Sequence, residues 1–128
     1  MSQPVTFVEL SGSTQGKGIK VVQTGTLGNT IHVTGTSASV RDRLFLWAVN
    51  SQAAATASTV LLTLEFGGVS TPDNLIQTPI PGQGGVVQLC DGTPLRGNGS
   101  AALTVSAFAA TANVIMVYGY VLRVTGDS

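Results

Sequence analysis

The segment Thr59–Phe66 has the sequence TVLLTLEF, and it decides the fold class because its hydrophobic residues recur at every second position, with Leu61 as the exception. Val60, Leu62 and Leu64 fall on one side of an extended chain, and the polar Thr63 falls on the other. Alternation with a period of two is typical of a β-strand that has one buried and one solvated face. This segment therefore predicts a strand at the surface of a hydrophobic core.

Short apolar runs of the same kind recur along the chain, separated by clusters of Gly, Pro, Asn and Asp. Regular turn residues between short strands are typical of all-β proteins. The one stretch of helical composition, Gln52–Ala57, is too short for a stable helix and is interpreted as a loop. The predicted strands are Val5–Glu9, Ile19–Gln23, Thr30–Thr34, Arg43–Val49, Thr59–Phe66, Leu75–Ile80, Val86–Leu89, Ala102–Phe108 and Val114–Val124.

The length of 128 residues suggests one domain, and neither a long linker nor a repeat divides the chain. Strands that are apolar on one face must bury that face against a second layer. The sequence therefore predicts an all-β, single-domain antiparallel β-sandwich over residues 1–128. Within it, residues 1–18 are interpreted as a flexible or docking N-terminal arm.

Charged residues are scarce in this chain. They make up 9% of it, where about 25% is usual, and six Lys and Arg balance six Asp and Glu. No basic patch supports binding to nucleic acid or to an anionic membrane. Neither a membrane span nor a signal peptide is visible. A neutral, charge-poor surface favours self-association, so we expect an obligate oligomer rather than a monomer with a Thr/Ser-rich exterior.

Two of the predicted strands, Arg43–Val49 and Val114–Val124, are apolar on both faces. A strand in a two-layer sandwich should have one wet face, so a second apolar face needs another cover. We place Leu44, Leu46, Met116, Tyr118 and Tyr120 on one face, although a period of two does not fix which face points inward. The opposite set is predicted to contribute to a subunit interface or to the core beside it: Phe45, Trp47, Ile115, Val117 and Val121.

Catalytic and metal chemistry have little support in the composition. The single His32 lies in an alternating strand, and we interpret it as a polar residue on the wetter face rather than as a base or a metal ligand. The single Cys90 has no visible base or cation nearby to activate it, so we interpret it as a small buried hydrophobe. No catalytic residue, metal site or cofactor is predicted.

The carboxylates lie mostly at predicted strand ends or turns and are interpreted as solvated, although a pair facing across a cleft would suit a glycosidase. They are Glu9, Asp42, Glu65, Asp73, Asp91 and Asp127. The densest charge cluster, Arg41-Asp42-Arg43, either docks a partner or protects an apolar strand from aggregation. The sequence favours neither role.

The second half of the chain resembles a family of phage proteins. The matching segments are Leu62-Thr63-Leu64-Glu65-Phe66-Gly67-Gly68, Thr71-Pro72-Asp73-Asn74-Leu75-Ile76, Thr104–Val114 and Gly119-Tyr120-Val121. They are similar to the trimeric β-sandwich decoration, or cement, proteins of tailed bacteriophages. The resemblance covers roughly residues 60 to 124 and rests on strand and turn patterns. It implies a jelly-roll-like sandwich that binds the major capsid protein, and it carries over no docking residue.

Three functional classes follow. The first is a structural virion protein, a homotrimeric capsid decoration protein without a catalytic site, made in the host cytoplasm and located on the capsid surface. The alternative is a carbohydrate-binding β-sandwich module or a phage fibre domain, for which Trp47, Tyr118 and Tyr120 are the candidate sugar-binding aromatics. The third is a small β-barrel enzyme, which the near-absence of His and Cys disfavours.

The single cysteine generates a simple prediction. We expect the melting temperature to be unchanged by a reductant or by a chelator, because Cys90 is unpaired and the fold needs no metal or cofactor. Thermal unfolding followed by circular dichroism with and without each reagent measures this. A drop of several degrees with either reagent would reveal a covalent bond or a metal site.

Overall fold

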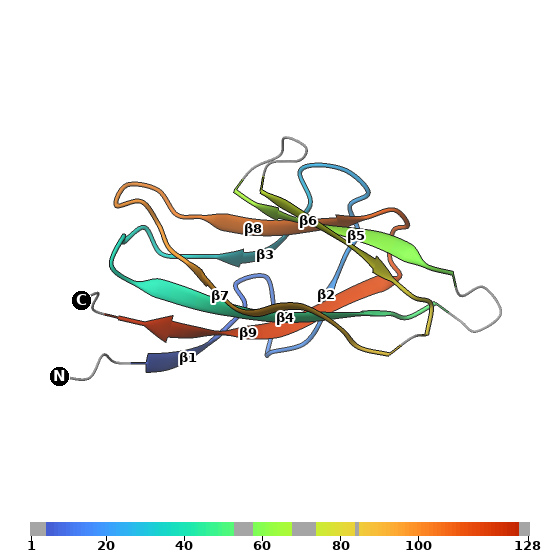
Figure 1. The fold of residues 1–128 in the computed structure, drawn as a ribbon, viewed down its shortest axis with the longest axis horizontal. Coiled ribbons are helices and arrows are strands. Elements are labelled where there is room, and N and C mark those ends of the chain that lie inside the picture. Colours follow the sequence, from blue (N-terminus) through green and yellow to red (C-terminus); the bar gives the residue numbers. More distant parts are fainter. Residues whose placement is uncertain (1–4, 53–57, 68–73, 84, 126–128) are drawn as a thin grey trace.

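The computed structural model describes residues 5–52, 58–67, 74–83 and 85–125. In these residues the chain forms nine strands and no helix, and the strands build two antiparallel sheets that pack face to face (Figure 1). The predicted all-β sandwich is confirmed. The Gln52–Ala57 loop lies, from residue 53 on, outside the described residues.

Each predicted strand has a counterpart in the structure, with shifted ends in most cases. In chain order the strands are β1 Val5–Glu9, β2 Ile19–Lys20, β3 Asn29–Val33, β4 Arg41–Asn50, β5 Val60–Phe66, β6 Leu75–Ile80, β7 Val87–Leu95, β8 Thr104–Ala109 and β9 Ile115–Val124.

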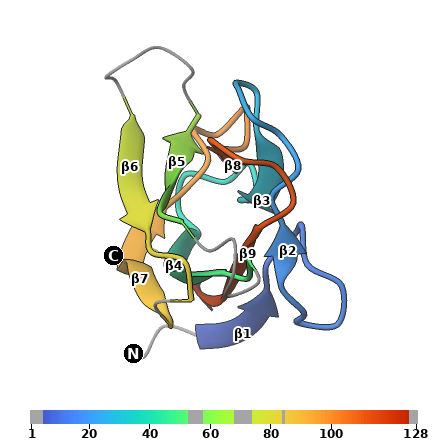
Figure 2. The same ribbon diagram turned by 90° about the vertical axis from the view of Figure 1, so that its right-hand side faces the viewer.

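The first sheet, sheet A, has the strand order β1-β9-β4-β7, and β2 pairs with the far end of β9 on the same side as β1. The second sheet, sheet B, has the order β3-β8-β5-β6. From β2 onward the chain changes sheet at every connection except the one between β5 and β6. Figure 2 shows the two layers end-on, with β1 and β2 along the same side of sheet A.

Among the strands whose length differs from the sequence-based expectation, β2 and β7 each differ for an evident local reason. The expected strand Ile19–Gln23 ends at Lys20 because the chain then crosses from sheet A to sheet B. The Val21 N–H still donates to the Ile115 carbonyl of β9 in sheet A, whereas the Gln23 carbonyl accepts from the Ala109 N–H of β8 in sheet B. β7 continues through Asp91-Gly92, which has turn composition. Gly92 has a φ of +93°, and the pairing register with β4 shifts in this region, so the residues form a bulge rather than a turn.

The pairing of β4 with β9 determines which residues form the core. It runs over all ten residues of both strands and places Phe45 opposite Tyr120 and Leu44 opposite Val121. Directly opposed residues share one face of a sheet. The inner face of sheet A therefore carries Leu44, Leu46, Ala48, Ile115, Val117 and Val121, all with no exposed surface.

The predicted grouping of apolar residues on these two strands is therefore wrong. Met116, Tyr118 and Tyr120 lie on the outer face with Phe45 and Trp47, and Ile115, Val117 and Val121 lie in the core of the single chain. The alternation along each strand was identified correctly. Which residues of β4 share a face with which residues of β9 depends on the register of the two strands, which the alternation does not show. A subunit interface remains a prediction only for Phe45 and Trp47.

The interpretation of residues 1–18 as an arm also changes. Val5–Glu9 is a strand of sheet A, and the next residue, Leu10, is 2% exposed in the core. From Val5 to Leu10 the segment is therefore part of the sandwich rather than flexible. Docking by this segment remains a prediction.

Adjacent residues near the end of β9 provide a test of the face assignment. Val121 faces the core and Leu122 faces outward, so Val121→Asp should destabilise the fold by several kcal/mol, because it buries an unpaired charge. Leu122→Asp should keep the fold, with a loss of about 1 kcal/mol or less. Chemical denaturation of both variants measures the difference. Equal losses would contradict the assigned register.

Candidate functional site

The outer face of sheet A carries a row of stacked aromatic side chains, which we call the aromatic row: Phe7 on β1, Tyr120 on β9, and Phe45 and Trp47 on β4. The ring centroids of Phe7 and Tyr120 are 4.7 Å apart, and those of Tyr120 and Phe45 are 4.9 Å apart. Trp47 meets Tyr120 edge-on at 6.2 Å. The row follows from the pairing of neighbouring strands, which brings outward side chains on three strands side by side.

The row is the centre of a larger apolar face. Met116, Tyr118 and Leu122 lie on the same side of β9 and are only partly buried in the single chain. Phe7, at the edge, is 71% exposed. Polar and charged side chains lie around this apolar surface rather than within it: Glu9, Lys20, Arg43, Gln88 and Asp91.

The orientation of the rings determines what this face can bind. Phe7, Tyr120 and Phe45 are nearly parallel, with interplanar angles of 20° and 13°. Parallel rings in a stack cover one another's faces and expose their edges to solvent. The middle of the row therefore presents ring edges, which suit packing against apolar side chains of another protein surface, while the end ring Phe7 remains largely exposed.

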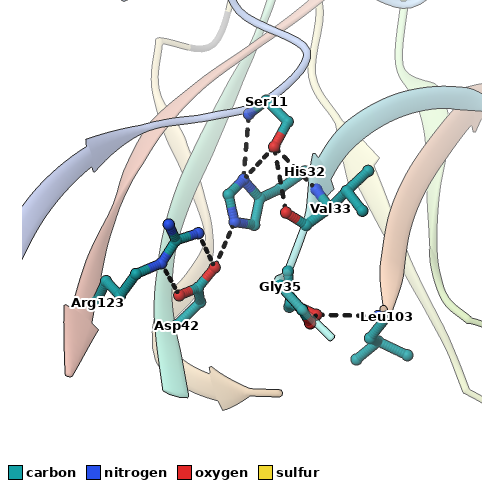
Figure 3. Close-up of polar contacts among 8 residues, drawn as sticks. Ser11, His32, Val33, Gly35, Asp42, Leu103 and Arg123 are labelled. Carbon is teal, nitrogen blue, oxygen red and sulfur yellow. Dashed lines mark hydrogen bonds and ion pairs between the residues drawn. The ribbon is translucent and has the colours of Figure 1, made fainter. Parts of the chain in front are cut away.

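A second candidate is a buried polar cluster at one end of the sandwich (Figure 3). A bulge in β3 puts His32 opposite Val105, so the ring turns inward and is 1% exposed instead of lying on a wet face as predicted. Its Nε2 lies 2.7 Å from Oδ2 of Asp42. Ser11 lies on the other side of the ring, with its backbone nitrogen and its Oγ each 3.1 Å from Nδ1.

The hydrogen bonds assign the tautomer of His32. The backbone N–H of Ser11 donates to Nδ1, which requires a lone pair there, so Nε2 carries the ring hydrogen and donates it to Asp42. Arg123 donates from Nε and Nη2 to the two oxygens of Asp42, at 2.8 and 2.9 Å. The carboxylate thus accepts three hydrogen bonds from β3 and β9.

The order Ser11, His32, Asp42 is that of a hydrolytic triad, but the surroundings do not suit nucleophilic catalysis. The lone pair of Nδ1 that would accept the hydroxyl proton already accepts the Ser11 backbone N–H. The neighbouring donors are also used: the Gly12 N–H donates to the Ile31 carbonyl, and the Val33 N–H donates to the Ser11 Oγ. Neither N–H is left to stabilise an oxyanion. The cluster is suited to fixing the β1–β2 loop onto β3 and β4.

The electrostatics of Asp42 fit that structural role. Burial alone raises the pKa of this carboxyl group, but hydrogen bonds and charge from Arg123, together with the hydrogen bond from His32, outweigh burial and lower the pKa below its usual value. The same contact raises the pKa of Arg123. The prediction that Asp42 is solvated is therefore wrong, because it is 1% exposed.

Glu65 is a second buried carboxylate, and it also departs from the predicted solvated position. It lies on the outer face of sheet B, opposite Ser106, and is 1% exposed because the β2–β3 loop covers it. The hydroxyl groups of Thr26 and Ser106 and the Gly28 N–H donate to it. Burial raises the pKa of Glu65, but these three donors outweigh burial and lower it.

The remaining candidate residues lie apart. Cys90 is unpaired and buried on β7, as predicted, and burial raises the pKa of its thiol. Glu9 and Asp91 are exposed, whereas Asp73 and Asp127 lie outside the described residues. The described part of the chain contains no cluster of three His, Cys, Asp or Glu side chains that could hold a metal ion. No helix in that part is long and apolar enough to cross a membrane.

No protein-family model, curated protein or solved structure matches this chain. The function of this chain is therefore inferred from its own residues and from the resemblance of residues 60–124 to decoration proteins.

Sequence reasoning missed the buried cluster and the grouping of the aromatic row. Ser11, Asp42 and Arg123 follow no spacing motif, because their approach to one another depends on the pairing of β4 with β9 and on the bulge in β3. The excess of apolar residues on β4 and β9 was the available signal for the row. It indicated a second apolar face without showing which side chains share it.

The two buried carboxylates generate a pH prediction. The pKa of each carboxyl group is lower in the folded chain than in the unfolded chain. Each group therefore stabilises the fold fully above the ordinary carboxyl pKa of about 4. This stabilisation is lost as the pH falls through the lowered pKa of the folded chain. We expect melting temperatures to fall on acidification below about pH 4. Circular dichroism melting over a pH series measures this.

Variants assign the effect to particular groups. At neutral pH, Asp42→Asn should cost about 3 kcal/mol, because it leaves Arg123 without its charged partner. Asp42→Asn and Glu65→Gln should each flatten the acid dependence, whereas the exposed Asp91→Asn should leave it unchanged. A wild-type melting temperature that is constant down to pH 2 would contradict the assignment.

Proposed function

We propose that this chain is a structural virion protein, a capsid decoration or cement protein that binds the outer surface of a phage capsid as a homotrimer and stabilises the shell. It has no catalytic role in this proposal and binds neither nucleic acid nor membrane. It is made in the host cytoplasm and ends on the virion. Its partners are copies of itself and the major capsid protein.

The observation that carries the proposal is the apolar outer face of sheet A. Phe7, Phe45, Trp47 and Tyr120 form a stacked row that the single chain leaves partly open. Large contiguous apolar surfaces on soluble proteins mark contacts with other molecules. In a chain with only 9% charged residues, such a face favours permanent association.

The strand order supports the finer part of the proposal, a jelly-roll sandwich. If the two-residue β2 is set aside, the other eight strands can be renumbered 1 to 8 in chain order. Sheet A, β1-β9-β4-β7, then has the order 1-8-3-6, and sheet B, β3-β8-β5-β6, has the order 2-7-4-5. We interpret this order as a jelly roll, an architecture of viral capsid proteins and of lectins. It is compatible with the resemblance of residues 60–124 to decoration proteins, and equally with a sugar-binding module.

A decoration protein of this kind would work mechanically. Each trimer would bridge neighbouring capsid subunits, and a standard interface buries about 1,600 Å². That contact must be broken before the shell ruptures. Because the three chains of a trimer are linked, each contact with the capsid can be modest in energy. Repetition of trimers over the shell adds up their stabilisation.

The second candidate is a carbohydrate-binding module or a phage fibre domain. The observation that favours it is the position of Trp47, Tyr118 and Tyr120, which lie on the outer face of sheet A rather than in the core. A sugar ring packs its C–H face flat against an aromatic ring. The stack covers both faces of the Tyr120 ring with Phe7 and Phe45, so we favour the structural protein.

Light scattering tests the oligomer. The expected mass is three times that of the 13.0 kDa chain, and Trp47→Lys should dissociate the trimer because it places a charge in the apolar contact. Leu61→Lys is the matched control, because Leu61 is 40% exposed on the other sheet. A wild-type monomer at micromolar concentration would overturn the trimer.

Sedimentation with empty shells of the virus that encodes the chain tests the partner. The protein should pellet with the shells and raise the temperature at which they rupture. The fluorescence of Trp47, the only tryptophan, provides the opposing test. A saturable change with added sugars, together with no binding to shells, would favour the carbohydrate-binding module.

A further inference from the structure

The four edges of the two sheets differ in how they are protected. An edge strand exposes unpaired N–H and C=O groups that another strand can join, and proteins block such edges with bulges, prolines, charges or covering loops. In the described residues the edge strands are β1 and β7 in sheet A, with the two-residue β2 on the same side as β1, and β3 and β6 in sheet B. Comparing these strands shows which one can accept a partner.

Three of the edges carry a recognisable block. β7 has Pro94 and a pairing register that shifts twice along β4. β6 contains Pro79. β3 has a bulge and is covered by the β1–β2 loop, because the Gly12 N–H donates to the Ile31 carbonyl and the Ser11 hydroxyl contacts both backbone groups of Val33.

In the described residues, the edge formed by β1 has no proline, no bulge and no covering loop, and its one charge is Glu9 at its C-terminal end. Its residues, Val5-Thr6-Phe7-Val8-Glu9, contain no proline, glycine or lysine, and they pair with β9 in a continuous register. Two apolar side chains are largely open to solvent, with exposed fractions of 59% for Val5 and 71% for Phe7. β1 is therefore a flat, regular strand with β propensity, of the kind that pairs with another strand.

We propose that β1 pairs antiparallel with β1 of a second copy of this chain, so that the two copies of sheet A form one continuous sheet. A two-fold axis through the contact relates the two copies, as in most homodimers. The chemistry that would be recognised is an extended backbone with alternating outward apolar side chains. The inference does not depend on a capsid partner.

The register of this pair is determined by the strand itself. All five residues of β1 pair only when Phe7 lies opposite its own copy, with Val5 opposite Glu9 and Thr6 opposite Val8 of the partner. In this register the outer faces of the two sheets remain on the same side. Other registers that keep the faces together leave at least one residue of each strand unpaired.

The side chains on the outer face fit a second copy. Phe7 already stacks on Tyr120, and Tyr120 stacks on Phe45, so a Phe7 pair on the two-fold axis would join two aromatic rows into one. Aromatic cross-strand pairs stabilise sheets. Glu9, the only charge on β1, lies opposite an apolar Val5, and the two copies of Glu9 lie at opposite ends of the contact. Like charges do not oppose each other.

The contact is compatible with the homotrimer but separate from it. The trimer proposal uses the outer face of sheet A around Phe45 and Trp47, with Phe7 at its edge, whereas edge pairing uses the backbone of β1. If both contacts form, and the three β1 edges of one trimer all pair with those of a second trimer, the particle contains six chains. If only one forms, the mass in solution identifies which.

Site-directed cross-linking tests both the contact and its register. Phe7→Cys would place two thiols opposite each other with Cα atoms about 5 Å apart, within the range of a disulfide. Val5→Cys would place its two copies four residues apart along the strands, about 13 Å, which is too far for a disulfide. Cys90 is buried, so the wild-type chain provides the background.

With a mild copper–phenanthroline oxidant, we expect Phe7→Cys to give a disulfide dimer and Val5→Cys alone to give none. The double variant Val5→Cys/Glu9→Cys should restore cross-linking, because residues 5 and 9 oppose each other in the proposed register. No cross-link in Phe7→Cys, or equal cross-linking of Val5→Cys and Phe7→Cys, would overturn the proposal.

Light scattering separates this contact from the trimer. Phe7→Asp puts two like charges on the axis and should halve the mass, whereas Val86→Asp, at a 66% exposed position away from β1, should not change it. A three-chain particle unaffected by Phe7→Asp would overturn edge pairing and leave the decoration proposal intact. A two-chain particle that Phe7→Asp dissociates would support edge pairing and overturn the trimer.

Discussion

The pairing of β4 with β9 is the interaction on which the rest of the structure depends. These two strands join along all ten of their residues in the middle of sheet A. Their register sends Leu44 and Val121 into the core and Phe45 and Tyr120 to the outside. A shift of one residue in either strand would exchange core and surface side chains on that strand. The aromatic row and the buried Asp42–Arg123 pair are both consequences of this register.

The sandwich buries two carboxylates and compensates for each in a different way. Asp42 has a cationic partner in Arg123 and a hydrogen bond from His32. Among the described residues, Glu65 has no cationic hydrogen-bond partner and is held by hydroxyl and backbone donors from the β2–β3 loop and β8. Both arrangements fix a loop or a neighbouring strand to a sheet. The few charges of this chain thus serve partly as internal connections, which leaves the surface poorer still in charge.

The positions of the strands could be predicted from the sequence, but which side chains of each strand face the core could not. Alternation in β5 and turn residues between the runs identified all nine strand positions, because both signals are local. The positions of Ile115, Val117 and Val121 could not be predicted, since their face depends on which residue of β4 lies opposite. The contact between Asp42 and Arg123 spans 81 positions, and no local pattern indicates such a pair. The burial of Glu65 depends on a loop folding back over sheet B, which strand periodicity does not predict.

The position of β9 has a consequence for how the chain acquires its fold during synthesis. Translation proceeds from the N-terminus, so β9 leaves the ribosome after the other described strands, yet it lies between β4 on one side and β1 and β2 on the other. Until it emerges, β1 and β2 lack the strand with which they pair. Sheet A therefore closes only once the last strand is available, and such long-range pairing is slow. Nascent chains of this protein spend their synthesis with open sheet edges, a period in which crowding by other copies favours premature association.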